Sequence, residues 1–403
     1  MTHIVVVGAG QAGSSLCAKL RSSGFDGQIT LVGEEPVPPY QRPPLSKKYL
    51  LGEMALERLY LRPAQFYEDE GITLRLGQAV TSIDRDAKTL TLGSDVLTYD
   101  HLAFTTGSSP RRLPAAIGGD LPGVFVVRDL KDVDGMAPDF VLGRHVLVVG
   151  GGYIGLEAAA VAAAKGLKVT VVEAAPRILQ RVACEETSAY FRALHRAHDV
   201  RILENVGLER LLGEDHVTGA RLSDGSEIAV DFVIAGIGIL PNDTLAQQAG
   251  LDVDAGIKVN LRGHTDDHHV WAAGDCARFP YRGEIIRLES VQNAIDQAEC
   301  VAENMMGAAR DYVPKPWFWS DQYDVKLQIA GLNMGYTDVV ARVGDRDGSQ
   351  SVWYYRGDTL LAVDAMNDPR NYMIGKRLIE AGKSPAPDAI ADPATDMKAL
   401  LQA

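Results

Sequence analysis

Several familiar features are missing from this 403-residue chain, and each absence excludes a class of protein. The four cysteines form no C-x-x-C pair and no short metal-type spacing, which argues against a redox-active disulfide and against a cysteine metal site. We interpret Cys17, Cys184, Cys276 and Cys300 as reduced, mostly buried thiols. No run of about 18 apolar residues is present, so no transmembrane helix is expected.

Positive charge is also scarce. The chain has 40 Lys and Arg against 53 Asp and Glu, a formal net charge of −13, which argues against nucleic acid or an anionic membrane surface as a generic partner. The first strand is expected at His3, which leaves no room for a signal or transit peptide, so we expect a cytoplasmic protein. The length and the 46% hydrophobic content indicate a globular protein of two or three domains.

The strongest positive signal is a G-x-G-x-x-G pattern between a strand and a helix. An apolar run at 146–149 leads into Gly150, Gly152 and Gly155, and alanine-rich sequence follows. The first glycine makes the turn, the second lets backbone approach a pyrophosphate, and the third lets the helix pack on the strand. Glu173 ends the next strand, where an acidic residue holds a ribose hydroxyl. A glycine turn in another α/β unit is the alternative.

A second copy of the pattern lies at the N-terminus. The first strand leads into Gly8, Gly10 and Gly13, and the next strand ends before Glu34, with Glu35 as the neighbour that could substitute. Two fingerprints imply two dinucleotides, and we interpret them as a flavin and a nicotinamide nucleotide.

The pattern at 150–155 also bears on the choice between NADH and NADPH. Arg177 and Arg181 follow Glu173 and are a possible signal for a 2′-phosphate. Because Glu173 would repel that phosphate, NADH is favoured over NADPH.

Three further segments suit a flavin. The proline-rich stretch 36–48 is expected to be a stiff, extended loop that presents Arg42 and Lys47, although an ordinary solvated turn fits equally well. Asp275 follows a strand and a glycine, where a carboxylate can accept from a ribityl hydroxyl. A helix opening at 290–291 would aim its N-terminal amides at the flavin ring.

The rest of the chain reads as connections and a third domain. Residues 97–107 are expected to form one strand, with small residues at 105–108 and 236–238 where the chain crosses between domains. From 313 onward we expect a small antiparallel sheet with one helix, and a loosely held tail over 384–403.

The chain resembles the FAD-dependent, NADH-dependent ferredoxin reductases of bacterial haem-thiolate monooxygenases and Rieske-type ring dioxygenases. The resemblance runs from residue 3 to about 380, and it is carried by six motifs: Arg-Pro-Pro-Leu-Ser-Lys at 42–47, Gly-Gly-Gly-Tyr-Ile-Gly-Leu-Glu at 150–157, Ile-Ala-Gly-Ile-Gly-Ile-Leu-Pro-Asn at 234–242, Gly-Asp-Cys-Ala-Arg at 274–278, Glu-Ser-Val-Gln-Asn-Ala at 289–294 and Pro-Trp-Phe-Trp-Ser-Asp-Gln at 316–322.

The resemblance implies an α/β, glutathione-reductase-like fold with two Rossmann-type domains and a small α+β C-terminal domain. The FAD-binding domain would be split over 1–108 and 236–312. The NADH-binding domain would occupy 109–235, and the C-terminal domain 313–403.

The resemblance also assigns site residues, with no metal. FAD would contact the N-terminal glycine turn. The residues assigned to it are Gly8, Gly10, Ala12, Gly13, Glu34, Arg42, Lys47, Val80, Arg128, Asp275 and Val291. The nicotinamide nucleotide would contact Gly150, Gly152, Tyr153, Ile154, Gly155, Glu173 and Gly238. Lys47 would stand beside the flavin, paired with Glu157, and Tyr153 and Trp319 would flank the nicotinamide.

The function implied is electron transfer from NADH through FAD to an acidic [2Fe–2S] ferredoxin, by a monomer or weak homodimer. Candidate docking cations are Arg278, Arg282, Arg287, Arg310 and Lys315, with scattered solvated charge as the alternative reading. The competing functions are a rubredoxin reductase or an NADH oxidase on the same scaffold, and a redox-responsive interaction protein resembling apoptosis-inducing factor.

Overall fold

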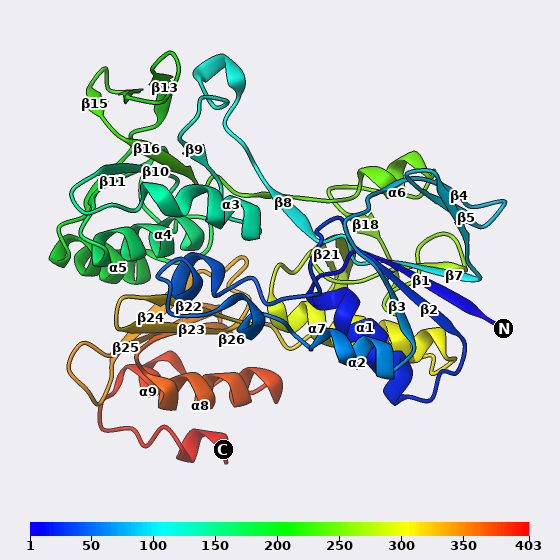
Figure 1. Ribbon diagram of the computed structural model, residues 1–403. Helices are drawn as coiled ribbons and strands as arrows, with labels where there is room; N and C mark the ends of the chain where they lie inside the picture. Colours follow the sequence, from blue (N-terminus) through cyan, green and yellow to red (C-terminus); the bar gives the residue numbers. More distant parts are fainter. Residues whose placement is uncertain (403) are drawn as a thin grey trace. The chain divides into compact units, whose positions relative to one another are not determined.

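The computed structural model describes residues 1–402 and separates into two compact units (Figure 1). Unit 1 comprises Met1–Arg42, Met54–Ser109 and Ile239–Pro314. Unit 2 comprises Pro43–Glu53, Pro110–Gly238 and Lys315–Ala403. None of the helices within residues 1–402 has the length and apolar character needed to cross a membrane.

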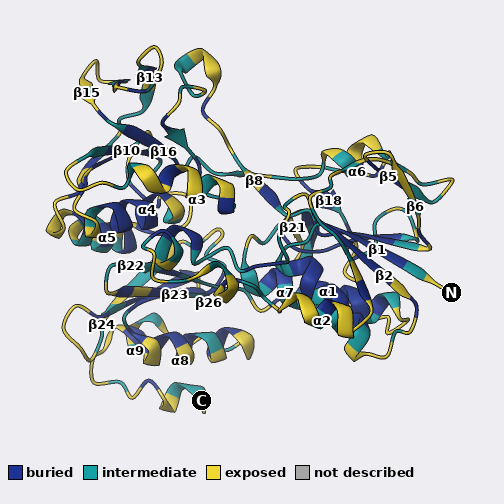
Figure 2. Ribbon diagram, viewed as in Figure 1, coloured by how far each residue is buried: buried dark blue, intermediate teal, exposed yellow. Residues whose placement is uncertain are grey.

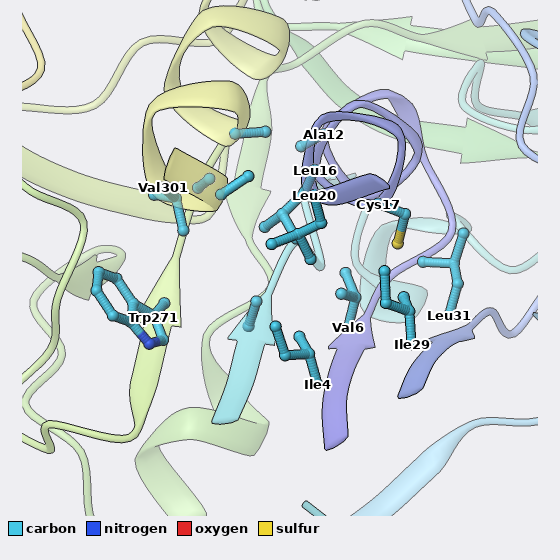
Figure 3. Close-up of a cluster of buried hydrophobic side chains, with 14 of the residues drawn as sticks. Ile4, Val6, Ala12, Leu16, Cys17, Leu20, Ile29, Leu31, Trp271 and Val301 are labelled. Atoms are coloured by element: carbon cyan, nitrogen blue, oxygen red, sulfur yellow. The ribbon is translucent and has the colours of Figure 1, made fainter. Parts of the chain in front are cut away.

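Unit 1 is built on a parallel five-stranded sheet. In order across the sheet, its strands are β19 (Val270–Ala272), β7 (His101–Phe104), β1 (His3–Val7), β2 (Gln28–Val32) and β3 (Ile72–Arg75). Helices α1 (Gln11–Ser22) and α7 (Val291–Met305) pack against each other and against this sheet. In Figure 3, Leu16 and Leu20 of α1 extend toward Ile4 and Val6 of β1. The β-branched strand residues and the apolar helix stripe therefore form one core.

Unit 2 holds a second parallel sheet, ordered β12 (Arg201–Glu204), β11 (Lys168–Glu173), β10 (His145–Val149), β16 (Phe232–Ala235) and β9 (Val124–Phe125). Its helices include α4 (Tyr153–Ala164) and α5 (Glu185–Ala197). The α4 helix is buried continuously from Gly155 to Ala162, because its small alanine side chains let β10 and β11 pack closely against it. Figure 2 shows the parallel strands of both units among the most buried elements.

The C-terminal part of unit 2 is an antiparallel sheet, as predicted. Its order is β22 (Trp317–Gln322), β23 (Val325–Gly331), β26 (Thr359–Met366), β25 (Gln350–Arg356) and β24 (Asp338–Val343). The predicted helix is α8 (Pro369–Glu380), and a short helix, α9 (Pro387–Ala391), follows it. The aromatic run at 317–319, for which no strand is predicted, lies in β22.

Smaller elements complete the two units. Three short sheets contain β4 (Val80–Asp84), β5 (Thr89–Leu92) and β6 (Asp95–Thr98); β13 (Leu208–Leu212), β14 (Gly219–Leu222) and β15 (Glu227–Ala229); and β18 (Ile257–Lys258), β20 (Ala277–Tyr281) and β21 (Glu284–Ile286). The remaining pair is β8 (Ser108–Pro110) with β17 (Ile239–Pro241), and the remaining α-helices within residues 1–402 are α2 (Ala64–Asp69), α3 (Leu130–Met136) and α6 (Thr244–Gln248).

Two local predictions are wrong. Residues 97–107 do not form one strand, because the chain turns at Asp100, whose carboxylate accepts a hydrogen bond from the His3 amide at 2.7 Å and so sets β7 beside β1. The stretch after Pro44 is not extended either. The Pro44 carbonyl accepts from the Lys47 and Tyr49 amides, both at 3.0 Å, and closes a helical turn over Leu45–Tyr49.

The prediction of a loose tail is also wrong. The Arg342 guanidinium donates to the backbone carbonyls of Ile390 at 2.8 Å and Asp392 at 2.6 Å. Ile390 and Met397 are buried in the core that α8 covers. The tail is thus fixed by a distant arginine and by two apolar side chains spaced among polar residues, a pattern too sparse to stand out in the sequence.

A buried carboxylate lies between the two parts of unit 2. Asp364 of β26 accepts hydrogen bonds from the Tyr354 hydroxyl and from Thr187 Oγ1, the latter at 2.8 Å. Burial raises the pKa of Asp364 from 3.8 to about 6, and the two hydrogen bonds oppose that rise. Folding therefore favours the protonated acid, so the contribution of Asp364 to stability is present at low pH and is lost as pH rises through about 6.

We expect Asp364→Asn to flatten the pH dependence of unfolding. Between pH 3.8 and about 6 the wild-type protein should lose up to about 3 kcal/mol relative to the variant, because Asn keeps an acceptor without a titrating proton. Urea unfolding across this window measures the difference. Asp358→Asn is the matched control, since Asp358 is exposed at the turn between β25 and β26. Parallel wild-type and Asp364→Asn curves would contradict the assignment.

Candidate active site

Both glycine turns have the geometry that their first and third glycines require. Gly8 and Gly150 have φ angles of +118° and +106°, and a Cβ on either would lie 2.3 or 2.4 Å from a backbone oxygen of the segment that follows the neighbouring strand. A Cβ on Gly13 or Gly155 would lie 2.1 Å from the carbonyl oxygen of the first glycine in its own turn. Since real Cβ atoms do not approach so closely, these four positions accept only glycine.

The second glycine of each turn leaves space for a ligand. A Cβ on Gly10 or Gly152 would meet no atom within 4 Å. Each of these glycines is the N-cap of its helix, α1 or α4, and supplies no capping side chain. Free amides and a positive helix end facing open space suit a pyrophosphate, so the two turns fit FAD and a nicotinamide nucleotide.

The glycine turn at 150–155 carries the other residues predicted to contact the nicotinamide nucleotide. The Glu173 carboxylate accepts from the amides of Gly151 at 2.7 Å and Ala175 at 2.8 Å, which fixes it at the glycine turn. Ile154 is 44% exposed at the start of α4 although it is apolar. Gly238 has a φ of +102° on the segment that follows β16. Within unit 2, Glu173 and Ile154 thus lie at the glycine turn after β10, and Gly238 follows β16, the strand beside β10.

The first turn distinguishes the two candidate ribose carboxylates. Glu35 accepts hydrogen bonds from the Tyr40 hydroxyl at 2.5 Å and from the Arg42 guanidinium at 2.6 Å. Glu34 is exposed at the end of β2. Because Glu35 is committed to its two partners, the geometry favours Glu34 for contact with a ligand.

The Gly-Asp pair after β19 lies at the first glycine turn. A Cβ on Gly274 would approach Ala12 of α1 to 3.1 Å, so only a glycine lets the two segments meet this closely. Asp275 follows, and its carboxylate accepts from Ser108 Oγ at 2.8 Å. The helix predicted to open at 290–291 is α7, which begins at Val291. Three predicted FAD contacts, Ala12, Asp275 and Val291, therefore come from adjoining parts of unit 1.

Lys47 and Glu157 form an ion pair within unit 2, with 3.0 Å between Nζ and Oε1. Ser320 Oγ donates to the same carboxylate oxygen at 2.7 Å, and Asp321 lies 4.0 Å from Lys47 Nζ. Burial raises the pKa of the Glu157 carboxyl, while Lys47 and Ser320 oppose the rise. A buried carboxylate needs such partners to stay ionised, so the pair is a built site rather than a solvated contact.

Family comparison agrees with this geometry. A model described as pyridine nucleotide-disulphide oxidoreductase matches residues 2–298, and one described as reductase C-terminal matches residues 317–401. The chain belongs to the pyridine nucleotide-disulphide oxidoreductases. It is an oxidoreductase that uses FAD and NAD(P)H, which confirms the predicted class of enzyme and its two cofactors.

Relatives cover the whole chain. It is 42% identical to rhodocoxin reductase from Rhodococcus erythropolis, over 99% of this chain and 94% of the relative, and 43% identical to a ferredoxin–NAD(P)(+) reductase from Sphingomonas sp., over 99% and 98%. The solved covalent complex of putidaredoxin reductase with putidaredoxin matches with a TM-score of 0.96 at 37% identity, over 100% of this chain and 98% of the solved chain. The predicted glutathione-reductase-like architecture is confirmed.

Although the family is named for a disulphide, this oxidoreductase has none. Cys17, Cys184, Cys276 and Cys300 are all free and buried, as predicted. Burial raises the pKa of each thiol, which keeps the reactive thiolate form rare. No group of His, Cys, Asp or Glu within residues 1–402 is placed to hold a metal ion.

The aromatic side chains predicted to flank the nicotinamide lie in unit 2. The Tyr153 ring packs against Phe318 at 5.1 Å, and its hydroxyl is buried without a hydrogen-bond partner in the described part of the chain. Trp319 packs against Trp317 at 5.5 Å and is partly exposed. Tyr153 thus anchors the start of α4 to β22, and both residues are partly exposed.

The predicted FAD residues divide between the units. Lys47 and Arg128 belong to unit 2, and Arg128 stands just before Asp129, the N-cap of α3. The others belong to unit 1, where Val80 is the first residue of β4 and pairs with Leu92.

Sequence reasoning missed three polar residues connected to the Lys47–Glu157 pair. Ser320 and Gln322 are on one face of β22, and His195 is on α5; all three are fully buried. The first two stand in the aromatic motif at 316–322, but nothing in the sequence marks them as more than polar residues beside tryptophans. His195 has no local signal at all.

The open space at the second glycine leads to a prediction. Gly152→Ala should leave the free energy of unfolding within about 0.5 kcal/mol of wild type, because the methyl group meets nothing. It should weaken NAD⁺ binding at least about tenfold, because the methyl group enters the pyrophosphate position. Calorimetric binding to the holoprotein and urea unfolding measure the two effects.

Gly155→Ala is the contrasting variant. Its Cβ would clash with the Gly150 carbonyl oxygen, so it should destabilise unit 2 by about 1–3 kcal/mol. Normal NAD⁺ affinity in the Gly152→Ala variant would show that this glycine does not face the nucleotide.

Proposed function

We propose that the protein is an NADH:ferredoxin reductase that passes electrons from NADH through FAD to a [2Fe–2S] ferredoxin, which in turn feeds a haem-thiolate monooxygenase or a Rieske oxygenase. The observation that carries the proposal is two open dinucleotide turns in a chain whose cysteines are all buried and free. With no thiol relay, electrons must leave from the flavin itself. When bound, FAD supplies the chemistry that allows a hydride, carrying two electrons, to be delivered as single electrons.

Comparison with relatives supports a ferredoxin as acceptor. The Sphingomonas relative is named a ferredoxin reductase, and the solved complex holds a reductase of this fold together with putidaredoxin. We further propose a cytoplasmic protein that acts as a monomer or weak homodimer, as inferred from the sequence.

The contacts of Arg177 support NADH rather than NADPH. Its guanidinium donates to the carbonyls of Ala183 at 2.8 Å and Cys184 at 3.1 Å, so it holds the entry to α5 together. It is therefore not available for a 2′-phosphate. Glu173, fixed at the glycine turn, places a negative charge where that phosphate would be.

The Lys47–Glu157 pair holds an ammonium group in a mostly enclosed position. Lys47 is 17% exposed, so its ammonium keeps most of its field within the protein. In the proposed reaction Lys47 stabilises negative charge that develops on reduction, and Glu157 keeps the ammonium in place. The remaining task of the protein is to position the two cofactors.

The candidate docking cations differ in whether they already form ion pairs with carboxylates. Three candidates contact carboxylates: Arg278 with Asp254, Arg287 with Glu289 and Arg310 with Glu303. Arg282 and Lys315 are exposed, and the Arg282 guanidinium lies over the Tyr281 ring, 5.2 Å from its centre. We propose that Arg282 of unit 1 and Lys315 of unit 2, each considered by itself, contribute more than the paired cations to the attraction of an acidic ferredoxin.

The direct test is anaerobic. One equivalent of NADH is added to the yellow holoprotein, and an oxidised [2Fe–2S] ferredoxin follows while the visible spectrum is recorded. The proposal predicts flavin bleaching, then recovery as the iron–sulfur bands fade, with slower transfer as salt rises. Bleaching without transfer to ferredoxin would reject it. Transfer to rubredoxin, rapid oxygen consumption or NADH-dependent dimerisation would identify one of the competing functions.

Lys47→Met should slow flavin reduction by about tenfold or more while FAD remains bound, because losing about 1.4 kcal/mol of charge stabilisation costs a factor of ten. Stopped-flow mixing with NADH measures the rate. Lys48→Met is the matched control, since Lys48 is the exposed neighbour on the same turn. Equal rates for the two variants would remove Lys47 from the mechanism.

A further inference from the structure

A continuous chain of hydrogen bonds leads through the interior of unit 2 to Glu157. Tyr323 Oη lies 3.1 Å from His195 Nδ1, and His195 Nε2 lies 2.8 Å from Gln322 Oε1. Gln322 Nε2 donates to Ser320 Oγ at 3.2 Å, and Ser320 Oγ donates to Glu157 Oε1 at 2.7 Å. His195, Gln322 and Ser320 have no exposed surface, so water does not compete for these bonds.

The chemistry of the groups gives the chain one direction. A carboxylate only accepts, so the single proton of Ser320 points to Glu157, and Ser320 Oγ receives the Gln322 amide proton. With its nitrogen used in this way, Gln322 presents its oxygen to His195, which must carry its proton on Nε2. Tyr323 then donates to the bare Nδ1. Burial lowers the pKa of His195 to about 4, which keeps the ring neutral.

The weak point of this chain is the Gln322 amide. Rotated by half a turn, it would offer its oxygen to Ser320, and the one serine proton could then leave Glu157 for the amide. With the ring proton on Nε2, the rotated amide would oppose N–H to N–H in a buried site, so rotation requires that proton to move to Nδ1 and the Tyr323 hydroxyl to accept instead of donate. A residue on α5 thereby controls a hydroxyl on β22, and through it a carboxylate on α4.

We propose that His195 is a positioning residue for Glu157: by locking the Gln322 amide it commits the Ser320 proton to the carboxylate and holds Glu157 ionised beside Lys47. The consequence for flavin reduction rests on the proposed function, whereas the effect on Glu157 does not.

Few charged or titratable groups act on Glu157 and His195. Lys47, from the Leu45–Tyr49 turn, and Asp321, from β22, are the charged groups that act on Glu157. Two titratable groups within the described residues act on His195: Tyr323, whose hydroxyl lies 3.1 Å from Nδ1, and His198, whose ring stacks on Tyr323 at 3.7 Å. Since His198 lies outside the hydrogen-bonded chain, it provides a control on the same helix.

The test measures the protonation of Glu157 itself, by infrared pH-difference spectra of the holoprotein, with the band assigned by its loss in Glu157→Gln. His195→Phe keeps a ring of similar size but has no donor, and His195→Leu serves if it does not fold. The expected result is a rise of about one pH unit or more in the Glu157 titration midpoint. His195→Gln, which restores an N–H at the Nε2 position, should recover the wild-type midpoint. His198→Leu should not change it.

A double variant separates positioning from general damage. In His195→Phe/Gln322→Met the side chain at 322 can no longer compete for the serine proton, so the midpoint should return toward the wild-type value. A wild-type midpoint in His195→Phe, or no recovery in the double variant, would overturn the proposal. Under the proposed function, the pH profile of flavin reduction by NADH shifts with the midpoint. If the Glu157 titration midpoint shifts but the pH profile of flavin reduction does not, His195 keeps its positioning role. The role of the Lys47–Glu157 pair in flavin reduction is then rejected.

Discussion

One buried carboxylate, Glu157, ties together three elements of unit 2. Glu157 is on α4, the helix that begins at the second glycine turn, and its oxygen accepts from Lys47 and Ser320 at 3.0 and 2.7 Å. A charge this deeply buried is tolerated only with partners on several sides, and here the partners come from different elements. The glycine turn, the Leu45–Tyr49 turn and β22 are therefore held in one arrangement by an electrostatic requirement as well as by packing.

A steric limit fixes the backbone at the two glycine turns. In both turns the third glycine presses on the carbonyl of the first, which brings the helix close to the strand and leaves free space only at the second. The same contact recurs in two units, each time after a strand of similar sequence, His3–Val7 and His145–Val149. Together with four inaccessible thiols, this arrangement suits an enzyme in which chemistry depends on bound nucleotides and not on cysteine.

The sequence predicted most regular elements and failed where a segment depends on a distant partner. The glycine turns, the C-terminal sheet and α8 follow from patterns of a few adjacent residues. The tail does not, because the carbonyls that Arg342 binds carry no sequence signature. The helical turn at Lys47 was also not predicted. Prolines indicate an extended loop, but a proline carbonyl, here that of Pro44, can also close a turn.

The two glycine turns, the family and the cofactors were determined by the sequence, because a steric demand that only glycine meets is local and visible in a single chain. The motifs likewise marked Lys47 and Glu157 as a pair. Only the tertiary structure decided which protons point at Glu157. That direction depends on His195, Gln322 and Ser320 meeting from α5 and β22 at fully buried positions. Hydrogen-bond partners that converge from distant segments leave no periodicity or spacing to read.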